Sequence, residues 1–555
     1  MRGDVRNVLF GDEARAKVLK GARKAARLAA IGYGPTSWNV SIQRTYGSAL
    51  ISHDGITNLK DLVVNDQSED MGIDLMKQAS EKSADVSGDG STATVLLGYE
   101  IMKLANQRIA AGYNAAGLRR GIDKASLWIK EQLDSLATPV PDKDLDYVAS
   151  ISAGDDEVGK LVADTVRKVG VGITVEEYDG LGVVQDVVEG TYFEKGFARP
   201  HFVTDRETEE VIHENINIMV LEKRIKQNQD IIPLLEMVYN NMNHKSVLII
   251  GNISDQALDT CVLTNMAGKI KVCVVPPPVY GDQVLPFLED MATITGGKLV
   301  PQDIPPDKVT SEYLGFAKKI IVTRDSTTIL GSEGPEEDIK LRIETIKKQL
   351  KDDKFTSFQK ERMEMRLAKL QGKIGLIKVG GASEAERREL KLRVDDSVLA
   401  TRAAKEEGIV AGGAVTLANL GLAPKPRLIQ SFNRLFRKLR KKISYDTDIN
   451  EAEGFRVVLE SLQVLFMHLI ENAGENPQAR LKQILASGGS MGFNVRKMTE
   501  EPIDLVKAGV IDPVKVLKSV VENACSTAGV GITIGATLTI DRQYQLQELE
   551  LRRSQ

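Results

Sequence analysis

The pattern that most constrains this chain is a block of short β-branched runs enclosed on both sides by helical sequence. From about residue 183 to 330, short β-branched runs alternate with helical stretches, which predicts a compact α/β module; these runs are SVLII, KVCVVPPP, KLVPQDIPP and KKIIVT. Residues 12–31 and 71–133 before it, and residues 384–486 after it, carry apolar side chains at helical spacing. We therefore expect helices from both ends of the chain to pack as one discontinuous domain that carries the α/β module as an insertion.

An inserted module of this kind is usually hinged at the two crossing strands, where the chain enters the module and where it returns. Pro139 and Gly190 lie near the first crossing and Gly408 lies near the second, and both residue types interrupt regular structure. Residues 335–371 carry Glu and Lys at helical spacing, which predicts a charged helical pair with a solvated face.

The composition narrows the class of protein. With 555 residues the chain is long enough for several domains, and its net charge of −4 argues against a general nucleic-acid binder. The cysteines, Cys261, Cys273 and Cys525, match no disulfide framework or metal spacing, which fits a reducing compartment. The N-terminus lacks the apolar core of a signal peptide, and the longest uncharged run, 524–540, is too short and polar for a membrane span. We expect a cytoplasmic protein with no membrane or nucleic-acid partner.

One segment, VSGDGSTATVLLGYEI from Val86 to Ile101, places glycines, hydroxyls and a carboxylate directly before an apolar helix. A helix N-terminus presents unpaired N–H groups and a partial positive charge, so it favours a phosphate. A simple turn that caps the helix explains the same residues, and the segment alone leaves both interpretations open.

Three further aspartates are candidates for a functional site, and each also has an ordinary structural explanation. Asp54 precedes Gly55, which is also the pattern of an ordinary turn. Asp396 lies in helical sequence, where a solvated face explains it equally well. Asp512 precedes Pro513, a pattern typical of a helix N-cap followed by proline at the first helical position.

The chain closely resembles the group I chaperonins, the GroEL-like family, in the order and spacing of its motifs. The match runs colinearly from about residue 5 to 540 through FGDEAR, GYGP, HDGIT, GDGSTATVLL, AGYNAAGLRRGID, DVVEGTYFEKGF, TGGKLV, IKVGGASEAE, RVDDSVLATRAAKEEGIVAGG and GVIDPVKV. The resemblance implies a multidomain α+β/α fold in three parts. These are a mostly helical equatorial ATP-binding domain (1–135 and 407–555), a small intermediate hinge domain (136–188 and 375–406) and an inserted α/β apical substrate-binding domain (189–374).

The family is an ATP-driven folding machine, so the resemblance implies a nucleotide site built from these motifs. Asp89 matches the carboxylate at magnesium, and Asp54 matches a carboxylate near the γ-phosphate and the attacking water. Asp396 matches the hydrolytic carboxylate delivered from the intermediate domain. These residue types suit phosphoryl transfer, which needs positioning and charge neutralisation. The nucleotide-binding residues implied by the resemblance are Gly34, Pro35, Asp89, Gly90, Ser91, Thr92, Gly413, Asn494 and Asp512.

The resemblance also implies a polypeptide-binding surface on the inserted domain. Amphipathic helices usually face their own core, so spacing alone favours core packing for the residues concerned. The family resemblance instead implies that they line a groove that captures exposed apolar segments. The residues are Phe197, His201, Phe202, Ile232, Leu235, Leu258, Val262 and Leu263.

The implied function is that of an ATPase chaperonin that captures non-native polypeptides and promotes their folding in the cavity of a homo-oligomeric, heptameric ring, single or double. ATP and Mg²⁺ are the implied cofactors, while K⁺ and a co-chaperonin stay open. The implied location is a bacterial-type cytosol, including that of a phage-infected cell. A ring-forming holdase or scaffold with reduced ATP cycling is the alternative. A small-molecule kinase or ligase is disfavoured, because the sequence contains no Walker motif.

Several positions depart from the family's pattern. The phosphate loop has one hydroxyl residue fewer, His53 replaces the usual lysine, and Gly32 and Tyr33 replace a Thr-Leu pair, so monovalent-ion dependence and turnover rate stay open. Met467 and Asn476 stand where an arginine and a glutamate commonly pair between rings. We hypothesise from this that ring stacking is weakened or altered.

Overall fold

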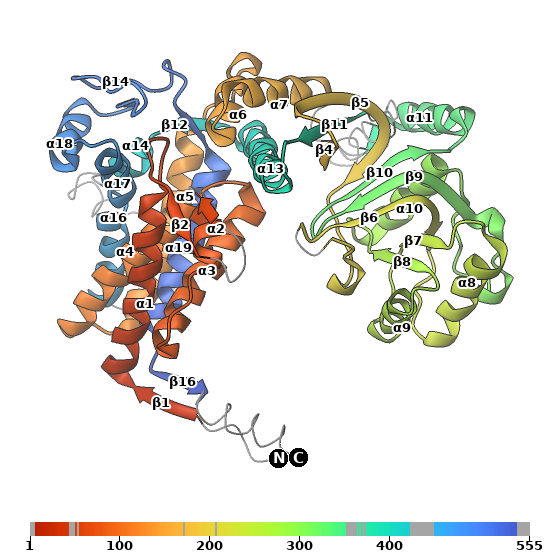
Figure 1. The fold of residues 1–555 in the computed structure, drawn as a ribbon, viewed down its shortest axis with the longest axis horizontal. Helices are drawn as coiled ribbons and strands as arrows, with labels where there is room; N and C mark the ends of the chain where they lie inside the picture. The colour runs from red at the N-terminus through yellow and green to blue at the C-terminus, as the bar shows by residue number, and fades with distance from the viewer. Residues whose placement is uncertain are drawn as a thin grey trace. The chain divides into compact units, whose positions relative to one another are not determined.

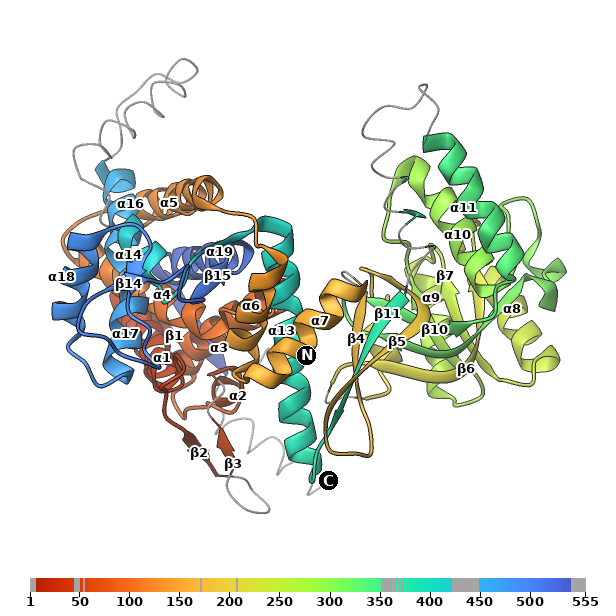
Figure 2. The same cartoon turned by 90° about the horizontal axis from the view of Figure 1, so that it is seen from above.

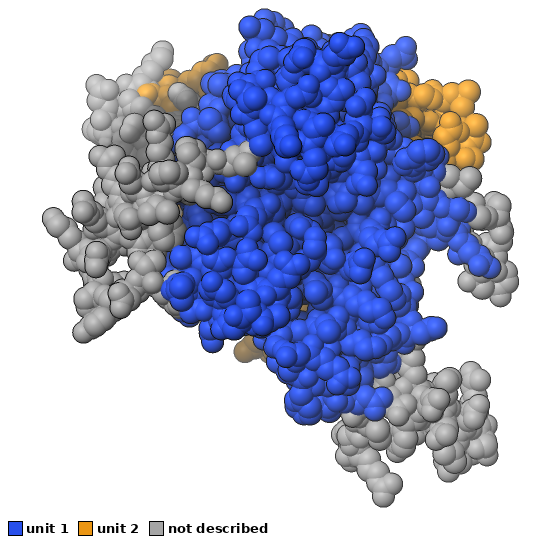
Figure 3. Space-filling view, turned by 90° about the vertical axis from the view of Figure 1, so that its left-hand side faces the viewer, with its two compact units in different colours: residues 1–164, 392–555 blue, residues 165–391 orange. Residues whose placement is uncertain are grey.

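The chain forms two compact units that follow the predicted insertion. The computed structural model describes residues 6–43, 50–52, 55–169, 172–205, 208–350, 363, 366–367, 370, 373–421 and 449–540. Unit 1 consists of Met1–Asp164 and Leu392–Gln555, and unit 2 of Thr165–Lys391 (Figures 1 and 3). Both ends of the chain therefore belong to one unit, and the middle forms the other. The finer division into three domains stays a prediction.

Unit 1 is mainly helical. Long helices alternate with tight turns because the apolar positions recur at helical spacing and glycines interrupt them. Its helices are α1 (Gly11–Ile31), α2 (Gly55–Lys60), α3 (Gln67–Ser87), α4 (Ser91–Ala110), α5 (Ala115–Leu136), α6 (Leu145–Ala153), α14 (Val415–Leu420), α16 (Ile449–Ser461), α17 (Val464–Asn472), α18 (Pro477–Ser487) and α19 (Val514–Ile532). Helices α7 (Asp156–Val169) and α13 (Glu384–Glu407) each contribute residues to both units.

The two ends of the chain meet in a small sheet. Strand β1 (Arg6–Phe10) pairs antiparallel with β16 (Ala536–Ile540), with Val8 opposite Leu538. The other strand pairs of unit 1 are even shorter: β2 (Val40–Ile42) with β3 (Leu50–Ser52), β12 (Ile409–Ala411) with β15 (Ile511–Pro513), and β13 (Met491–Gly492) with β14 (Ile503–Asp504). The pairing of β1 with β16 confirms that sequence from both sides of the insertion builds one unit.

The core of unit 1 is built around α4, whose apolar residues cover more than one face. Val95, Leu97 and Ile101 are fully buried, as expected for a helix that is hydrophobic all round. Helices α1 and α3 cross closely because Gly72 has no side chain at the crossing. A Cβ atom on Gly72 would lie 2.0 Å from the carbonyl oxygen of Val18.

Unit 2 is an eight-stranded mixed sheet with helices, and its strands run in the order β4-β11-β5-β10-β9-β6-β7-β8. The β6-β7-β8 side is parallel, as the alternation of strands and helices predicted, and β11 runs parallel to β4. The strands are β4 (Ile173–Glu177), β5 (Gly182–Phe193), β6 (Val211–Val220), β7 (Ser246–Ile250), β8 (Lys271–Val275), β9 (Leu314–Val322), β10 (Thr327–Ser332) and β11 (Lys373–Gly380). The helices are α8 (Asn228–Asn241), α9 (Asp255–Met266), α10 (Val284–Thr295) and α11 (Glu336–Leu350) (Figure 2).

The charged segment of unit 2 packs through few residues. Helix α11 is largely exposed and buries Ile346, which confirms the predicted solvated face for the first half of the 335–371 segment. Arg342 of α11 and Arg366 both donate to the buried carboxylate of Asp290 on α10, at 2.8 Å and 2.7 Å. Most of residues 351–371 lie outside the described residues. Among the described residues, no helix combines the length and apolar character needed to cross a membrane.

Candidate functional site

The turn between α3 and α4 is built on two glycines in the left-handed region. Gly88 ends α3 with φ 69°, and Gly90 precedes α4 with φ 82°. A Cβ atom on Gly88 would lie 2.2 Å from Cβ of Leu399, and one on Gly90 would lie 2.5 Å from Cγ2 of Val520. Both the backbone conformation and the close packing therefore require glycine at these two positions.

Asp89 lies between these glycines, and its loop is held by short hydrogen bonds. The Gly90 N–H donates to Oδ1 of Asp89 at 2.5 Å. The buried Ser87 hydroxyl lies 2.9 Å from the carbonyl oxygen of Ser83 and 3.1 Å from that of Asp89. Gly90 occupies the N-cap position of α4 and has no side chain with which to cap the helix. Among the described residues, the N-cap of this 20-residue helix makes no side-chain hydrogen bond to its first N–H groups, so the alternative of a side-chain cap is wrong.

Asp512 reaches the same region from the other end of the chain. It lies in β15, opposite Val410 of β12, and its Oδ1 is 3.0 Å from where a Cβ of Gly412 would be. Helix α19 begins at Val514 with Pro513 at its N-cap. Asp512 is thus a strand residue, and the alternative that it caps α19 is wrong, because the long-range pairing of β15 with β12 determines its backbone.

Asp89, Asp512 and Tyr33 share one electrostatic environment. Burial, followed by repulsion from Asp89, raises the pKa of Asp512 to about 7. Desolvation also raises the pKa of Asp89, although its side chain keeps contact with water, which moderates this effect. The pKa of the Tyr33 phenol is raised by burial and then by the charges of Asp512 and Asp89. Sequence reasoning did not include Tyr33 in the site, although its place directly before Gly34-Pro35 was a signal that could have found it.

Asp396 of α13 lies beside the turn that joins α3 and α4. Its carbonyl oxygen lies 3.2 Å from the Cβ position of Gly88, so this turn of α13 packs against the loop. Ser397 anchors the helix by donating to the carbonyl oxygen of Ala149 at 2.9 Å. The Asp396 side chain is exposed, unlike the buried face of the same helix. Asp54 lies outside the described residues.

Of the remaining predicted nucleotide residues, Ser91 and Thr92 are the first two residues of α4, and the others lie on loops of unit 1. Gly413 has φ 62° and follows β12, and its Cβ position is 3.8 Å from the carbonyl oxygen of Phe493. Asn494, the next residue, accepts the Arg496 N–H at 3.1 Å. Gly34, with φ 88°, and Pro35 form the turn after α1. The structure therefore places Asp89, Gly90, Asp512 and the backbone of Asp396 in one neighbourhood, and Gly413 beside Asn494.

The carboxylates of this site suit a hard cation that is also bound to phosphate oxygens. Asp89 and Asp512 are two carboxylates whose negative charges are costly in the same place, and a divalent cation would relieve that cost. Within the part of the chain that the structure describes, no three His, Cys, Asp or Glu side chains gather into a group able to hold a metal ion. Asp89 therefore fits Mg²⁺ if phosphate oxygens supply the further ligands, and Asp512 adds negative charge nearby.

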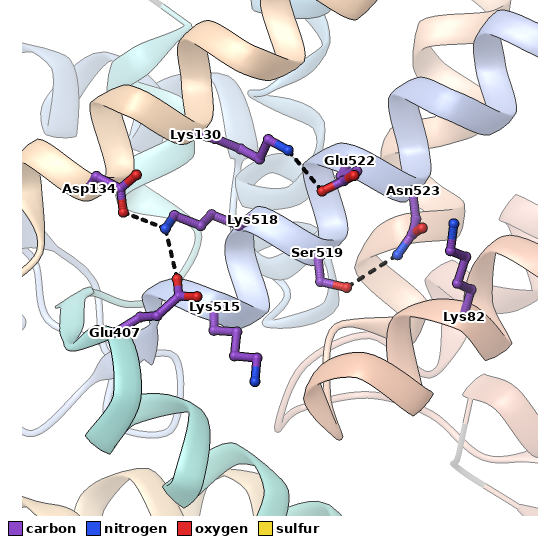
Figure 4. A pocket seen from close by; sticks show the side chains of 9 residues that line it. All are labelled: Lys82, Lys130, Asp134, Glu407, Lys515, Lys518, Ser519, Glu522 and Asn523. Carbon is purple, nitrogen blue, oxygen red and sulfur yellow. Dashed lines mark hydrogen bonds and ion pairs between the residues drawn. The ribbon is translucent and has the colours of Figure 1, made fainter. Parts of the chain in front are cut away.

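A separate pocket of about 500 Å³ in unit 1 contains none of the predicted site residues (Figure 4). Its charges largely compensate one another. Lys518 pairs with Glu407 at 2.8 Å and with Asp134, and Lys130 pairs with Glu522 at 2.9 Å. This self-neutralised lining gives no reason to assign it a charged ligand.

The eight predicted polypeptide-binding residues divide sharply by exposure. Leu263 is 67% exposed and Ile232 is 42% exposed. His201 is exposed, and Phe197 is half-buried. The remaining residues are buried and present little surface, because they lie on the inward faces of their elements: Phe202, Leu235, Leu258 and Val262.

Two exposed apolar residues on the same helices escaped the sequence prediction. Tyr239 of α8 is 42% exposed and Met266 of α9 is 70% exposed. Helices α8 and α9 pack against each other, so Ile232, Tyr239, Leu263 and Met266 all belong to one helical pair. Spacing from Ile232 along α8 was a signal for Tyr239, whereas Met266 lies at the very end of α9.

This chain matches the model of a protein family and is similar in fold to a solved chaperonin structure. The model of the TCP-1/cpn60 chaperonin family matches residues 26–539. The crystal structure of the chaperonin gp146 from the bacteriophage EL 2 (Pseudomonas aeruginosa), in the presence of ATP-BeFx, is similar in two crystal forms. Crystal form II has a TM-score of 0.71 and crystal form I one of 0.60. In both, the identity is 19%, and the match covers 96% of this chain and 99% of that chain.

Proposed function

This chain belongs to the TCP-1/cpn60 chaperonin family, and from that premise we propose that it is an ATP-dependent chaperonin. It binds Mg-ATP in unit 1, captures non-native polypeptides on exposed apolar residues of unit 2, and promotes their folding inside a homo-oligomeric, heptameric ring. The observation that carries the proposal is the convergence of Asp89 and Asp512 beside the uncapped N-terminus of α4.

In the proposed site, each group has a separate part. The N–H groups of the first turn of α4, with the Ser91 and Thr92 hydroxyls, bind phosphate oxygens. Asp89 holds Mg²⁺, which when bound supplies charge neutralisation at those oxygens. Asn494 and Asp512 contact the base and the ribose, while Gly34, Pro35 and Gly413 let the backbone approach the nucleotide.

Hydrolysis in this proposal depends on two carboxylates that orient and activate the attacking water, Asp54 and Asp396. The packing of α13 against Gly88 supports a role for Asp396, because it brings this helix to the phosphate loop. Since phosphoryl transfer needs little covalent chemistry from the protein, movement of α13 would change the rate by changing position alone.

Polypeptide capture in unit 2 is proposed for the exposed members of the predicted set and their neighbours on α8 and α9. Leu263, Ile232, Met266 and Tyr239 offer apolar surface of the kind that marks interaction sites. Apolar contact has no directional requirement, which suits unfolded chains of any sequence. We place this activity in a bacterial-type cytosol, including that of a phage-infected cell.

Nucleotide binding is tested by Asp89→Ala. We expect calorimetry to show Mg-ATP binding to the wild type and at least a tenfold weaker affinity in the variant, because the magnesium ligand is lost. Asp74→Ala, an exposed aspartate on α3, is the matched control and should bind normally. Equal affinity of Asp89→Ala and the wild type would contradict the site.

The coupling of ATP to folding is tested by Asp396→Ala. This variant should bind Mg-ATP with nearly unchanged affinity but lose almost all hydrolysis and ATP-dependent refolding of a denatured test protein. Normal turnover would refute the role of Asp396. A wild type that forms rings and prevents aggregation, but shows no ATPase activity, would identify the holdase or scaffold alternative instead.

A further inference from the structure

Helix α17 contacts the turn that follows α1 through two side chains on one of its faces. Leu469 and Asn472 are three residues apart and therefore lie on the same side of the helix. Both contact residues between Ala30 and Gly34, which are far away in the sequence but adjacent in unit 1. Figure 1 shows α17 beside the C-terminal end of α1.

Asn472 donates hydrogen bonds to two backbone carbonyl groups, one at each end of this turn. Its Nδ2 group donates to the carbonyl oxygen of Ala30 at 2.8 Å and to that of Tyr33 at 2.8 Å. The first carbonyl belongs to the last turn of α1 and the second lies directly before Gly34. A primary amide has two N–H donors, so one side chain satisfies both carbonyls and joins the helix end to the loop.

Leu469 fills the space that Gly34 leaves open. Gly34 has φ 88°, and a Cβ atom there would lie 2.4 Å from Cδ1 of Leu469. Leu469 itself is buried in the core of unit 1 and cannot move away without opening that core. The position and conformation of Gly34 are therefore set by α17, not by the loop alone.

We propose that Asn472 is a positioning residue for the nucleotide site, which acts by holding Tyr33 and Gly34 where the bound nucleotide meets them. This inference rests on the proposed function, which assigns Gly34 and Pro35 to nucleotide binding. The effect of Asp89 and Asp512 on the Tyr33 phenol supports it, because it places this turn beside the acidic part of the site.

The Asn472 amide holds the turn by donating two hydrogen bonds. The most informative substitution therefore keeps the shape of the side chain and removes its N–H donors. In Asn472→Asp, a carboxylate faces two carbonyl oxygens, and both hydrogen bonds are replaced by repulsion. The loop should leave its position, and nucleotide should then bind at the cost of returning it. Because hydrolysis from the bound state does not use this loop, KM for ATP should rise about tenfold while kcat stays within about twofold.

The test is steady-state ATPase kinetics and calorimetric Mg-ATP affinity of the full-length wild type, Asn472→Asp, and Asn106→Asp as matched control. Asn106 is also half-buried and donates through Nδ2 to a carbonyl, that of Met102 at 2.8 Å, but at the other end of α4. A raised KM and weakened affinity in Asn472→Asp, with Asn106→Asp unchanged, supports the inference.

Four results would go the other way. Unchanged KM in a folded Asn472→Asp, or loss of kcat and thermal stability without a change in KM, overturns the positioning role. If Asn472→Asp does not fold, Asn472→Ser keeps a single uncharged donor and should show a smaller rise in KM; no rise overturns the inference. A wild type that does not bind Mg-ATP refutes the proposed function itself, which distinguishes the two failures.

Discussion

Replacing Asp512 by asparagine should make the nucleotide-free protein more stable at pH 8 while changing its stability little at pH 4. The pKa of Asp512 is raised from 3.8 to about 7 by burial and by repulsion from Asp89. Between these two values, the native state keeps a proton that the unfolded chain has already lost. The free energy of unfolding therefore falls as the pH rises from about 4 to about 7 and is constant above that. Asparagine does not titrate, so Asp512→Asn removes this loss.

The size of the effect follows from the shift. About three pH units at about 1.4 kcal/mol each give a ceiling of about 4 kcal/mol above pH 7. Asp512 keeps partial contact with water, which stabilises its charged form and reduces the cost. We therefore expect Asp512→Asn to increase the free energy of unfolding by about 1–2 kcal/mol at pH 8.

The assay is denaturant unfolding followed by circular dichroism at pH 4 and pH 8, with chelator and without nucleotide. Asp504→Asn is the control with opposite sign, since a hydrogen bond from Ser490 lowers the pKa of Asp504. That variant should lose stability at pH 8 relative to the wild type. If Asp512→Asn shows the same difference from the wild type at both pH values, the electrostatic account of the site is refuted.

Three further predictions concern the framework that would carry the two proposed activities. Gly72→Ala should cost about 1–3 kcal/mol, because its Cβ would meet the Val18 carbonyl at 2.0 Å, and should lower the melting temperature. Gly535→Ala, whose Cβ would meet open space, should leave the melting temperature unchanged. Equal melting temperatures of the two variants would contradict the close crossing of α1 and α3. Asp290→Ala leaves two arginines without their shared buried carboxylate and should cost about 3 kcal/mol in denaturant unfolding, whereas Glu336→Ala, which removes an exposed ion pair, should leave the unfolding midpoint nearly unchanged. Burial and the charge of Lys271 lower the pKa of His213 to about 4, so stability should fall as pH drops from about 6.5 to 4, by up to about 3 kcal/mol. His213→Leu should flatten that pH profile of unfolding, and an unchanged profile would argue against a neutral buried histidine.

The insertion of an α/β module into a helical domain could be predicted from the sequence because it rests on local periodicity. Helix α1 was expected at 12–31 and is found at Gly11–Ile31, and the runs SVLII and KVCVV form β7 and β8. Spacing reports backbone conformation within a few residues, and that information is complete in one stretch of chain. The run KLVPQDIPP, by contrast, forms no named strand, and only Val300 bridges to Leu221.

Local reasoning was wrong where a distant segment determines the environment of a residue. Asp512-Pro513 has the local pattern of an N-cap, but pairing with β12 makes Asp512 a strand residue beside Gly412. On α9, spacing favoured core packing for Val262 and Leu263 alike, but Val262 is buried whereas Leu263 is exposed. Which side of an amphipathic helix faces water depends on the sheet beneath it.

By itself the sequence determined the order of helices and strands, the inserted module, the glycines at the turns and the family to which the chain belongs, because each depends on residues close together in the chain. Only the tertiary structure decided that Asp89, Asp512 and Tyr33 share one environment, that Asn472 holds the turn before Gly34, and that four of the predicted polypeptide-binding residues are buried. Charge interaction, exposure and hydrogen bonding between distant segments depend on distances in space, and those exist only once the chain has folded.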